Sequence, residues 1–166
     1  DSQNLYERMS ARDNLKFYAR LYRVDKSRVE QVLEQVGLIR RAGDKLSEYS
    51  SGMKQRLLIG RALLHEPRVL FLDEPTRGLD PTIARDIRKI VLQLAAEGMT
   101  IFLTTHYMEE AEQLSSRVAI IDQGQIVALD SPESLIKRYT LGENTNLEDV
   151  FVHLTGRHLG RGSDAL

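Results

Sequence analysis

The sequence predicts an α/β fold in which helices come first and a parallel sheet with flanking helices follows. Amphipathic helical patterns fill residues 10–63, whereas continuous apolar runs at 69–72 and 100–104 are typical of strands. A strand, a helix and a second strand in this order indicate a right-handed crossover between parallel neighbours. The 166 residues, 42% of them hydrophobic and 28% charged, suit one ordinary globular domain.

Three helical patterns lie in the first part of the chain. Ser10 is typical of an N-cap and begins the first of them. The second starts near Asp25, carries apolar residues at 3.6-residue spacing and ends at Gly37. The third follows the turn-prone residues 50–52 and ends before Pro67.

Strands and helices alternate in the second part. The runs 69–72 and 100–104 are typical of strands buried on both faces of a sheet. Between them, Asp80 before Pro81 indicates an N-cap followed by a first-turn proline. Further elements are expected as a short helix at 109–114, strands at 118–121 and 126–129 joined by a hairpin turn, a helix opening at Ser131, an amphipathic stretch at 147–154 and a loose tail at 156–166.

Composition excludes several classes of protein. Lys plus Arg number 23 and Asp plus Glu 24, so the net charge of −1 does not indicate a dedicated nucleic-acid binder. The absence of cysteine excludes a disulfide scaffold and a thiol nucleophile, and it fits a reducing compartment. No apolar run reaches the ~18–20 residues of a membrane span, and no signal peptide is visible. Because no Met opens the sequence, we expect the chain to begin inside a longer one.

Two adjacent carboxylates, Asp73 and Glu74, follow the first predicted strand. Open α/β sheets bind their ligands beyond the carboxyl ends of the strands. An aspartate there can hold Mg²⁺ beside a phosphate, and the next glutamate can orient or deprotonate an attacking water. The alternative is a strand that simply ends in solvated acids.

Two other segments carry groups that can contact a phosphate. The second predicted strand ends in Thr104, Thr105 and His106, and a histidine at a strand end can hydrogen-bond a phosphate. The small residues 50–52 precede a helix whose first N–H groups can hold an anion, although for this segment taken by itself an ordinary serine N-cap is the better explanation. The remaining histidines are interpreted as structural: His65, His153 and His158.

In this order and spacing, these segments resemble the nucleotide-binding domain of ABC transporters. Residues 49–56 resemble the signature motif, and residues 69–74 resemble Walker B with its catalytic glutamate. Residues 78–80 resemble the D-loop, and His106 resembles the switch histidine of the H-loop.

The resemblance covers nearly the whole chain. Residues 5–22 are similar to the helical subdomain after the Q-loop, and residues 147–156 resemble the C-terminal end of ABC-2 type export subunits. The implied fold is the C-terminal part of a P-loop ATPase core plus an α-helical subdomain. The implied division is a helical subdomain ending in the signature helix at 1–66, the C-terminal half of the ATPase core at 67–130, and a C-terminal helical extension and tail at 131–166.

The sequence departs from the family pattern in three places. In the signature, Tyr49, Ser51 and Met53 replace the usual Leu, first Gly and Gln, and Ser51 puts a Cβ where backbone approaches phosphate. The Q-loop glutamine position falls on Asp1. No lysine follows a glycine, so the phosphate-binding P-loop (Walker A) is not in these residues. We interpret the chain as the C-terminal two-thirds of the domain.

The resemblance implies an ATPase on the cytoplasmic face of the cell membrane that drives export through a transmembrane permease subunit. ATP and Mg²⁺ are the implied cofactors, with Glu74 activating water, Asp73 holding Mg²⁺ and His106 contacting the γ-phosphate. A second nucleotide-binding domain is the implied head-to-tail partner. The residues implied to bind the nucleotide or link the two sites of that dimer are Ser50, Ser51, Gly52 and Asp80.

Two other functions remain open from the sequence. One is a soluble ABC-type ATPase that acts on nucleic acid or ribosomes, but the near-neutral charge and the ABC-2-like C-terminus argue against a nucleic-acid partner. The other is a non-catalytic fragment or interaction module. Without a P-loop, the isolated chain is expected to be inactive.

Overall fold

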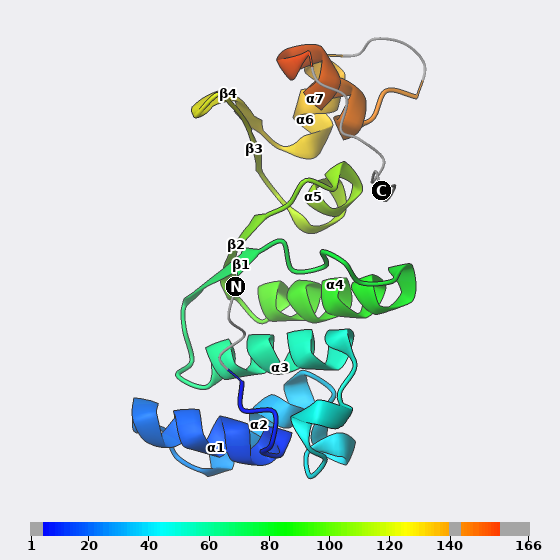
Figure 1. The fold of residues 1–166 in the computed structure, drawn as a ribbon. Helices are drawn as coiled ribbons and strands as arrows, with labels where there is room; N and C mark the ends of the chain where they lie inside the picture. Colours follow the sequence, from blue (N-terminus) through cyan, green and yellow to red (C-terminus); the bar gives the residue numbers. More distant parts are fainter. Residues whose placement is uncertain (1–4, 140–143, 157–166) are drawn as a thin grey trace. The chain divides into compact units, whose positions relative to one another are not determined.

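The computed structural model describes residues 5–139 and 144–156, and the predicted tail beyond 156 lies outside them. The chain forms two compact units, Asp1–Thr104 and Thr105–Leu166. The first contains α1 (Ala11–Tyr22), α2 (Ser27–Gln35), short 3₁₀ helices at Ile39–Arg41 and Leu46–Glu48, α3 (Ser51–Leu63), β1 (Val69–Asp73), α4 (Pro81–Ala96) and β2 (Thr100–Thr104) (Figure 1). The second contains α5 (Met108–Leu114), β3 (Val118–Asp122), β4 (Gln125–Asp130), α6 (Pro132–Arg138) and α7 (Leu147–Thr155).

Every helix and strand predicted within the described residues is present, and local capping explains where several of them begin. The Ser10 hydroxyl accepts a hydrogen bond from the backbone N–H of Asp13, and Asp80 accepts from the N–H groups of Thr82 and Ile83. Such caps replace the helical partners that the first N–H groups lack. Ser50 and Ser131 cap α3 and α6 in the same way.

The helices α1, α2 and α3 share an apolar core in the first unit. Leu15, Leu33 and Leu57 are fully buried there, one from each helix. A Cβ on Gly60 would lie 3.0 Å from Val32 Cγ1, so glycine lets α3 approach α2 closely. Full burial of each such leucine contributes about 1.5–3 kcal/mol, and this packing holds the start of α3 in place.

The strands β1 and β2 pair in parallel, with Asp73 opposite Thr104 at their carboxyl ends. The prediction that both strands are buried on two faces is wrong. Leu70 and Leu72 are buried, whereas Phe71 is 72% and Phe102 is 61% exposed. Side chains alternate between the faces of a strand, α4 packs against the sheet, and the other face is open in the described part of the unit.

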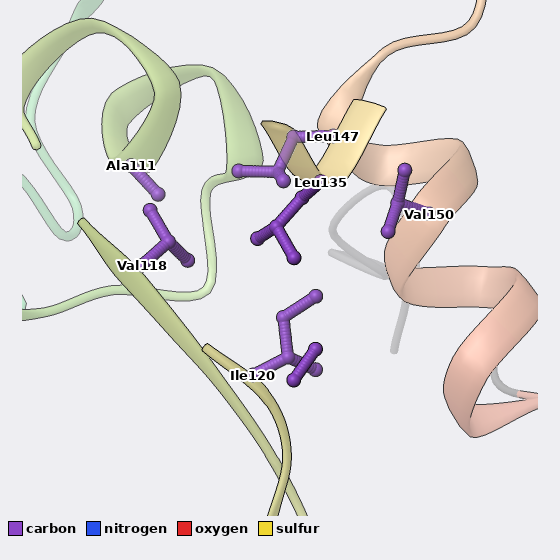
Figure 2. Close-up of a cluster of buried hydrophobic side chains, with 7 residues drawn as sticks. Ala111, Val118, Ile120, Leu135, Leu147 and Val150 are labelled. Carbon is purple, nitrogen blue, oxygen red and sulfur yellow. The ribbon is translucent and has the colours of Figure 1, made fainter. Parts of the chain in front are cut away.

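The second unit is built around a hairpin of β3 and β4. These strands pair in antiparallel fashion and form a two-stranded sheet. Gln123 and Gly124 both have positive φ, which this hairpin turn requires. Figure 2 shows the apolar core of the unit, which consists of Ala111, Val118, Ile120, Ala128, Leu135, Leu147 and Val150.

Candidate functional site

The carboxyl end of β1 presents the first of the paired carboxylates. Asp73 is the last residue of the strand, and its side chain is exposed. The hydroxyl of Thr104, directly opposite on β2, donates a hydrogen bond to Asp73 Oδ1. The strand pairing therefore orients this carboxylate, while its exposure leaves it accessible to a cation.

Glu74 begins a sharp turn away from the strand. Its φ of 44° is in the left-handed region, which costs a non-glycine residue on the order of 1–3 kcal/mol. The backbone N–H of Glu74 donates to the Thr104 carbonyl at 2.9 Å, and the Arg77 N–H donates to the Glu74 carbonyl at 3.1 Å. Arg77 Nε also lies 3.4 Å from Glu74 Oε2. The turn thus separates the two carboxylates although they are adjacent in sequence.

The turn continues to the start of α4. Thr76 is buried, and its carbonyl accepts a hydrogen bond from the Leu79 N–H at 3.2 Å. Gly78 has a φ of 70°, which favours glycine at this position. Asp80 Oδ1 accepts from the N–H groups of Thr82 and Ile83, both at 3.0 Å. Asp80 therefore acts as the N-cap of α4 in this chain.

Ser50 and Ser51 lie exposed at the N-terminus of α3. The Ser50 hydroxyl accepts a hydrogen bond from the Met53 N–H at 3.3 Å, so it is the N-cap. The preceding Tyr49 is buried, which raises the pKa of its hydroxyl to about 12, and this protonated hydroxyl donates to the Arg41 carbonyl at 2.8 Å. Tyr49 thus anchors the turn that leads into α3.

Gly52 differs from its two neighbours because it is buried. It lies in the first turn of α3, where α3 packs against α4. A Cβ at this position would fall 2.2 Å from Cγ2 of Ile83, which lies in the first turn of α4. The helix N-termini that carry Ser50 and Asp80 therefore meet within one unit (Figure 1).

The sequence of this chain is similar to those of known proteins. A family model described as ABC transporter matches residues 1–77. A linearmycin resistance ATP-binding protein of Bacillus subtilis (strain 168) is 44% identical over 148 residues, which make up 87% of this chain and 47% of that protein. The chain belongs to the ABC transporter family of ATP-binding proteins. A fluoroquinolones export ATP-binding protein of Mycobacterium tuberculosis (strain CDC 1551 / Oshkosh) is 48% identical over 132 residues, 80% of this chain and 44% of that protein.

A solved structure of this family supports the same assignment. The structure titled "Structure of ATP binding subunit of ABC transporter" superposes with a TM-score of 0.73 and 28% sequence identity. The superposition covers 90% of this chain and 64% of that one. The fold is accordingly part of a P-loop ATPase core with helices. The ABC chain spans about half the length of the curated relatives it matches.

The structure brings some of the predicted ABC site residues together. Asp73 and Glu74 lie at one sheet edge, and Ser50, Gly52 and Asp80 lie in the same unit as this edge. His106 belongs to the second unit, where it is exposed and its ring centroid is 4.1 Å from that of Tyr107.

Sequence reasoning missed three residues that shape this ABC site. Thr104 holds both acidic residues, through its hydroxyl to Asp73 and its carbonyl to Glu74. A threonine opposite an aspartate at the ends of paired strands is a usable signal only when the register is known. No sequence pattern indicates the contact of Arg77 with Glu74 or that of Ile83 with Gly52. These contacts depend on how the turn and the two helices pack.

The donor set at the sheet edge fits Mg²⁺ bound together with a nucleotide. Within residues 5–139 and 144–156 no group of three or more His, Cys, Asp or Glu residues could hold a metal ion by itself. Mg²⁺ at phosphate sites usually takes one or two carboxylates and completes its shell with water and phosphate oxygens. The exposed Asp73 carboxylate suits that role. In the same described ranges, no helix has the length and apolar character to span a bilayer.

Proposed function

We propose that this chain supplies the hydrolytic and dimer-facing residues of an ATP-binding subunit that drives export through a membrane permease. One observation carries the proposal: Asp73 ends a parallel strand, Glu74 follows it, and Thr104 on the next strand holds both. The names of the relatives, which include linearmycin resistance and fluoroquinolones export proteins, support export. The cytoplasmic face of the cell membrane is the location that follows from this role.

The proposal divides the chemistry between three side chains. Glu74 accepts a proton from the attacking water, and its side chain is partly exposed. Asp73 holds the cation in the orientation that Thr104 imposes. His106 donates a hydrogen bond to the terminal phosphate. Bound MgATP supplies the phosphoryl group and the charge of the cation, and little covalent chemistry is left for the protein.

The proposal places the N-termini of α3 and α4 at the interface with a second nucleotide-binding domain. The free N–H groups and hydroxyls at such a helix end are donors for phosphate oxygens. Asp80 links the two sites across this interface while it caps α4. The residues that contact the partner's ATP are Ser50, Ser51 and Gly52. The helical first part of the chain docks on the permease, with residues 5–15 near that contact.

A second candidate function is a non-catalytic interaction module. Residues 1–166 contain no Gly-x-x-x-x-Gly-Lys-Ser/Thr sequence, and that loop supplies the backbone cradle for the phosphates. A complete domain distinguishes the two candidate functions, because only the function of an ATPase would depend on the carboxylate of Glu74.

A complete nucleotide-binding domain that carries this sequence together with a P-loop tests the proposal. Glu74→Gln keeps the volume of the side chain and removes the proton acceptor, so turnover should fall by about 10²–10⁴-fold while ATP affinity stays unchanged. Glu66→Gln is a matched control, because Glu66 is an exposed glutamate of the same unit that also has positive φ. Wild-type phosphate release in Glu74→Gln would remove Glu74 from the mechanism.

A further inference from the structure

Gly52 of α3 lies against Ile83 of α4 so closely that no side chain fits between them. A Cβ on Gly52 would lie 2.2 Å from Cγ2, 3.2 Å from Cδ1 and 3.4 Å from Cβ of Ile83. The first of these distances is far inside van der Waals contact, and close-packed interiors do not absorb such an overlap. The space that a side chain at position 52 would occupy is therefore already filled from within the chain.

A second contact holds the same two helices one turn further along. Arg56 Nη2 lies 2.6 Å from Asp86 Oδ2, and both residues are at most half exposed. Gly52 and Arg56 are four residues apart on α3, and Ile83 and Asp86 are three apart on α4, so each pair lies on one helix face. Two contacts on matching faces fix the separation and the rotation of the two N-terminal turns.

These contacts lie directly behind the two helix caps. Ser50 precedes Gly52 by two residues, and Asp80 accepts a hydrogen bond from the N–H of Ile83 itself at 3.0 Å. A shift of Ile83 relative to Gly52 therefore moves the Ser50 turn relative to the Asp80 turn.

We propose that Gly52 and Ile83 form a spacer that joins the signature turn and the D-loop turn into one rigid surface. Position 52 is glycine because Ile83 occupies the space that a side chain would need, and the proposed contact of Gly52 with the partner's ATP is made by its backbone. Ile83 is then a positioning residue: it sets the distance between Ser50 and Asp80, which both meet a second copy of the ATP-binding subunit. This inference rests on the proposed function for the role of that surface.

A double-mutant cycle in the complete domain separates the two reasons for a glycine. The variants are Gly52→Ala, Ile83→Ala and both together, each in a Glu74→Gln background so that ATP-driven dimers persist for size-exclusion chromatography. In the presence of Ile83, Gly52→Ala should weaken dimerisation by about tenfold, as overpacking of a close contact does. In the Ile83→Ala background the same change should matter less than about twofold, because the space is then empty.

The melting temperature of the 166-residue chain gives a second readout that needs no nucleotide. Gly52→Ala should lower it, and Ile83→Ala should suppress that effect. Gly60→Ala is the matched control, since Gly60 is a buried glycine of α3 that faces Val32 instead. Its effect should be the same with and without Ile83.

Each result decides a separate point. An equal loss of dimerisation from Gly52→Ala in both backgrounds would overturn the spacer and assign the glycine to the ligand. Coupling in the melting temperature without coupling in dimerisation would leave a packing contact and overturn the positioning role. A domain in which Glu74→Gln hydrolyses ATP like the wild type would refute the proposed function, yet the thermal cycle would still test the contact.

Discussion

From the open face of the β1–β2 sheet we predict how strongly the isolated chain associates with itself. Phe71 is 72% and Phe102 is 61% exposed, and their ring centroids are 5.6 Å apart. Two exposed aromatic rings in contact form one apolar patch on a sheet face. We expect the isolated chain to associate with itself through this face, and Phe71→Thr to abolish the association while the strand is retained, because threonine favours strands.

The exposed areas determine how large the effect should be. For a phenylalanine of about 200 Å², the exposed part is about 140 Å² at Phe71 and about 120 Å² at Phe102. At ~25 cal/mol per Å², covering both rings on each of the two associating copies contributes about 13 kcal/mol. Removing Phe71 from both copies takes away about 7 kcal/mol of this. The remaining contribution of about 6 kcal/mol lies within the about 4–15 kcal/mol that association costs in lost freedom. The cost of Phe71→Thr to the stability of the folded chain is smaller. Only about a quarter of the ring is buried in the chain, so the free energy of unfolding should fall by about 1–1.5 kcal/mol.

Sedimentation velocity and light scattering over a concentration series measure the association. The wild-type chain should form larger species as its concentration rises, and Phe71→Thr should remain monomeric. Leu92→Thr is the matched control, because Leu92 is an apolar residue of α4 that is 46% exposed away from the paired strands. A monomeric wild-type chain with a cooperative melt would refute the reasoning. So would a Leu92→Thr variant that loses association as fully as Phe71→Thr.

Three further predictions concern the ATPase reaction. Purified residues 1–166 should release no appreciable phosphate from MgATP, and turnover comparable to that of a complete domain would contradict the need for a P-loop. In the complete domain, Ser50→Arg should spare nucleotide affinity of the monomer and stop ATP-driven dimerisation; loss of a cap alone would cost about 0.5–2 kcal/mol of stability without this selectivity. Thr104→Val should raise the Mg²⁺ concentration needed for half-maximal activity and leave Mg²⁺-free nucleotide binding intact, because Asp73 loses its hydroxyl partner. Thr104→Ser should restore the wild-type Mg²⁺ dependence, and Thr100→Val at the other end of β2 should not alter it.

Local chemistry allowed the sequence to determine the elements and where they begin. Ser10, Ser50 and Asp80 cap helices as their neighbours along the chain predicted, because an N-cap hydrogen bond spans only two or three residues. The hairpin turn at 123–124 follows from a similarly short-range rule for positive φ. The order of the motifs was sufficient to predict the family, which the comparisons confirmed.

The roles of the site residues were predicted from resemblance and stay predictions. The structure adds the means by which some of them are held: Thr104 contacts both acidic residues of the strand end, and Tyr49 anchors the turn before α3. Neither contact could be inferred from the chain alone. The first needs the register of two strands whose paired residues are 31 positions apart in sequence, and the second needs the burial of a side chain among helices.

Only the tertiary structure decided which surfaces are covered. A continuous apolar run such as 69–72 has the same sequence whether one face or both faces of its strand are buried, so the exposure of Phe71 depends on which elements pack against the sheet. The sequence also leaves open what occupies the space beside Gly52. Its missing side chain is equally compatible with a ligand and with a neighbour in the chain, and the packing of α3 on α4 places Ile83 in that space. Burial and close approach arise from segments distant in sequence, whereas caps and turns arise from neighbours, and the sequence by itself therefore determines only the latter.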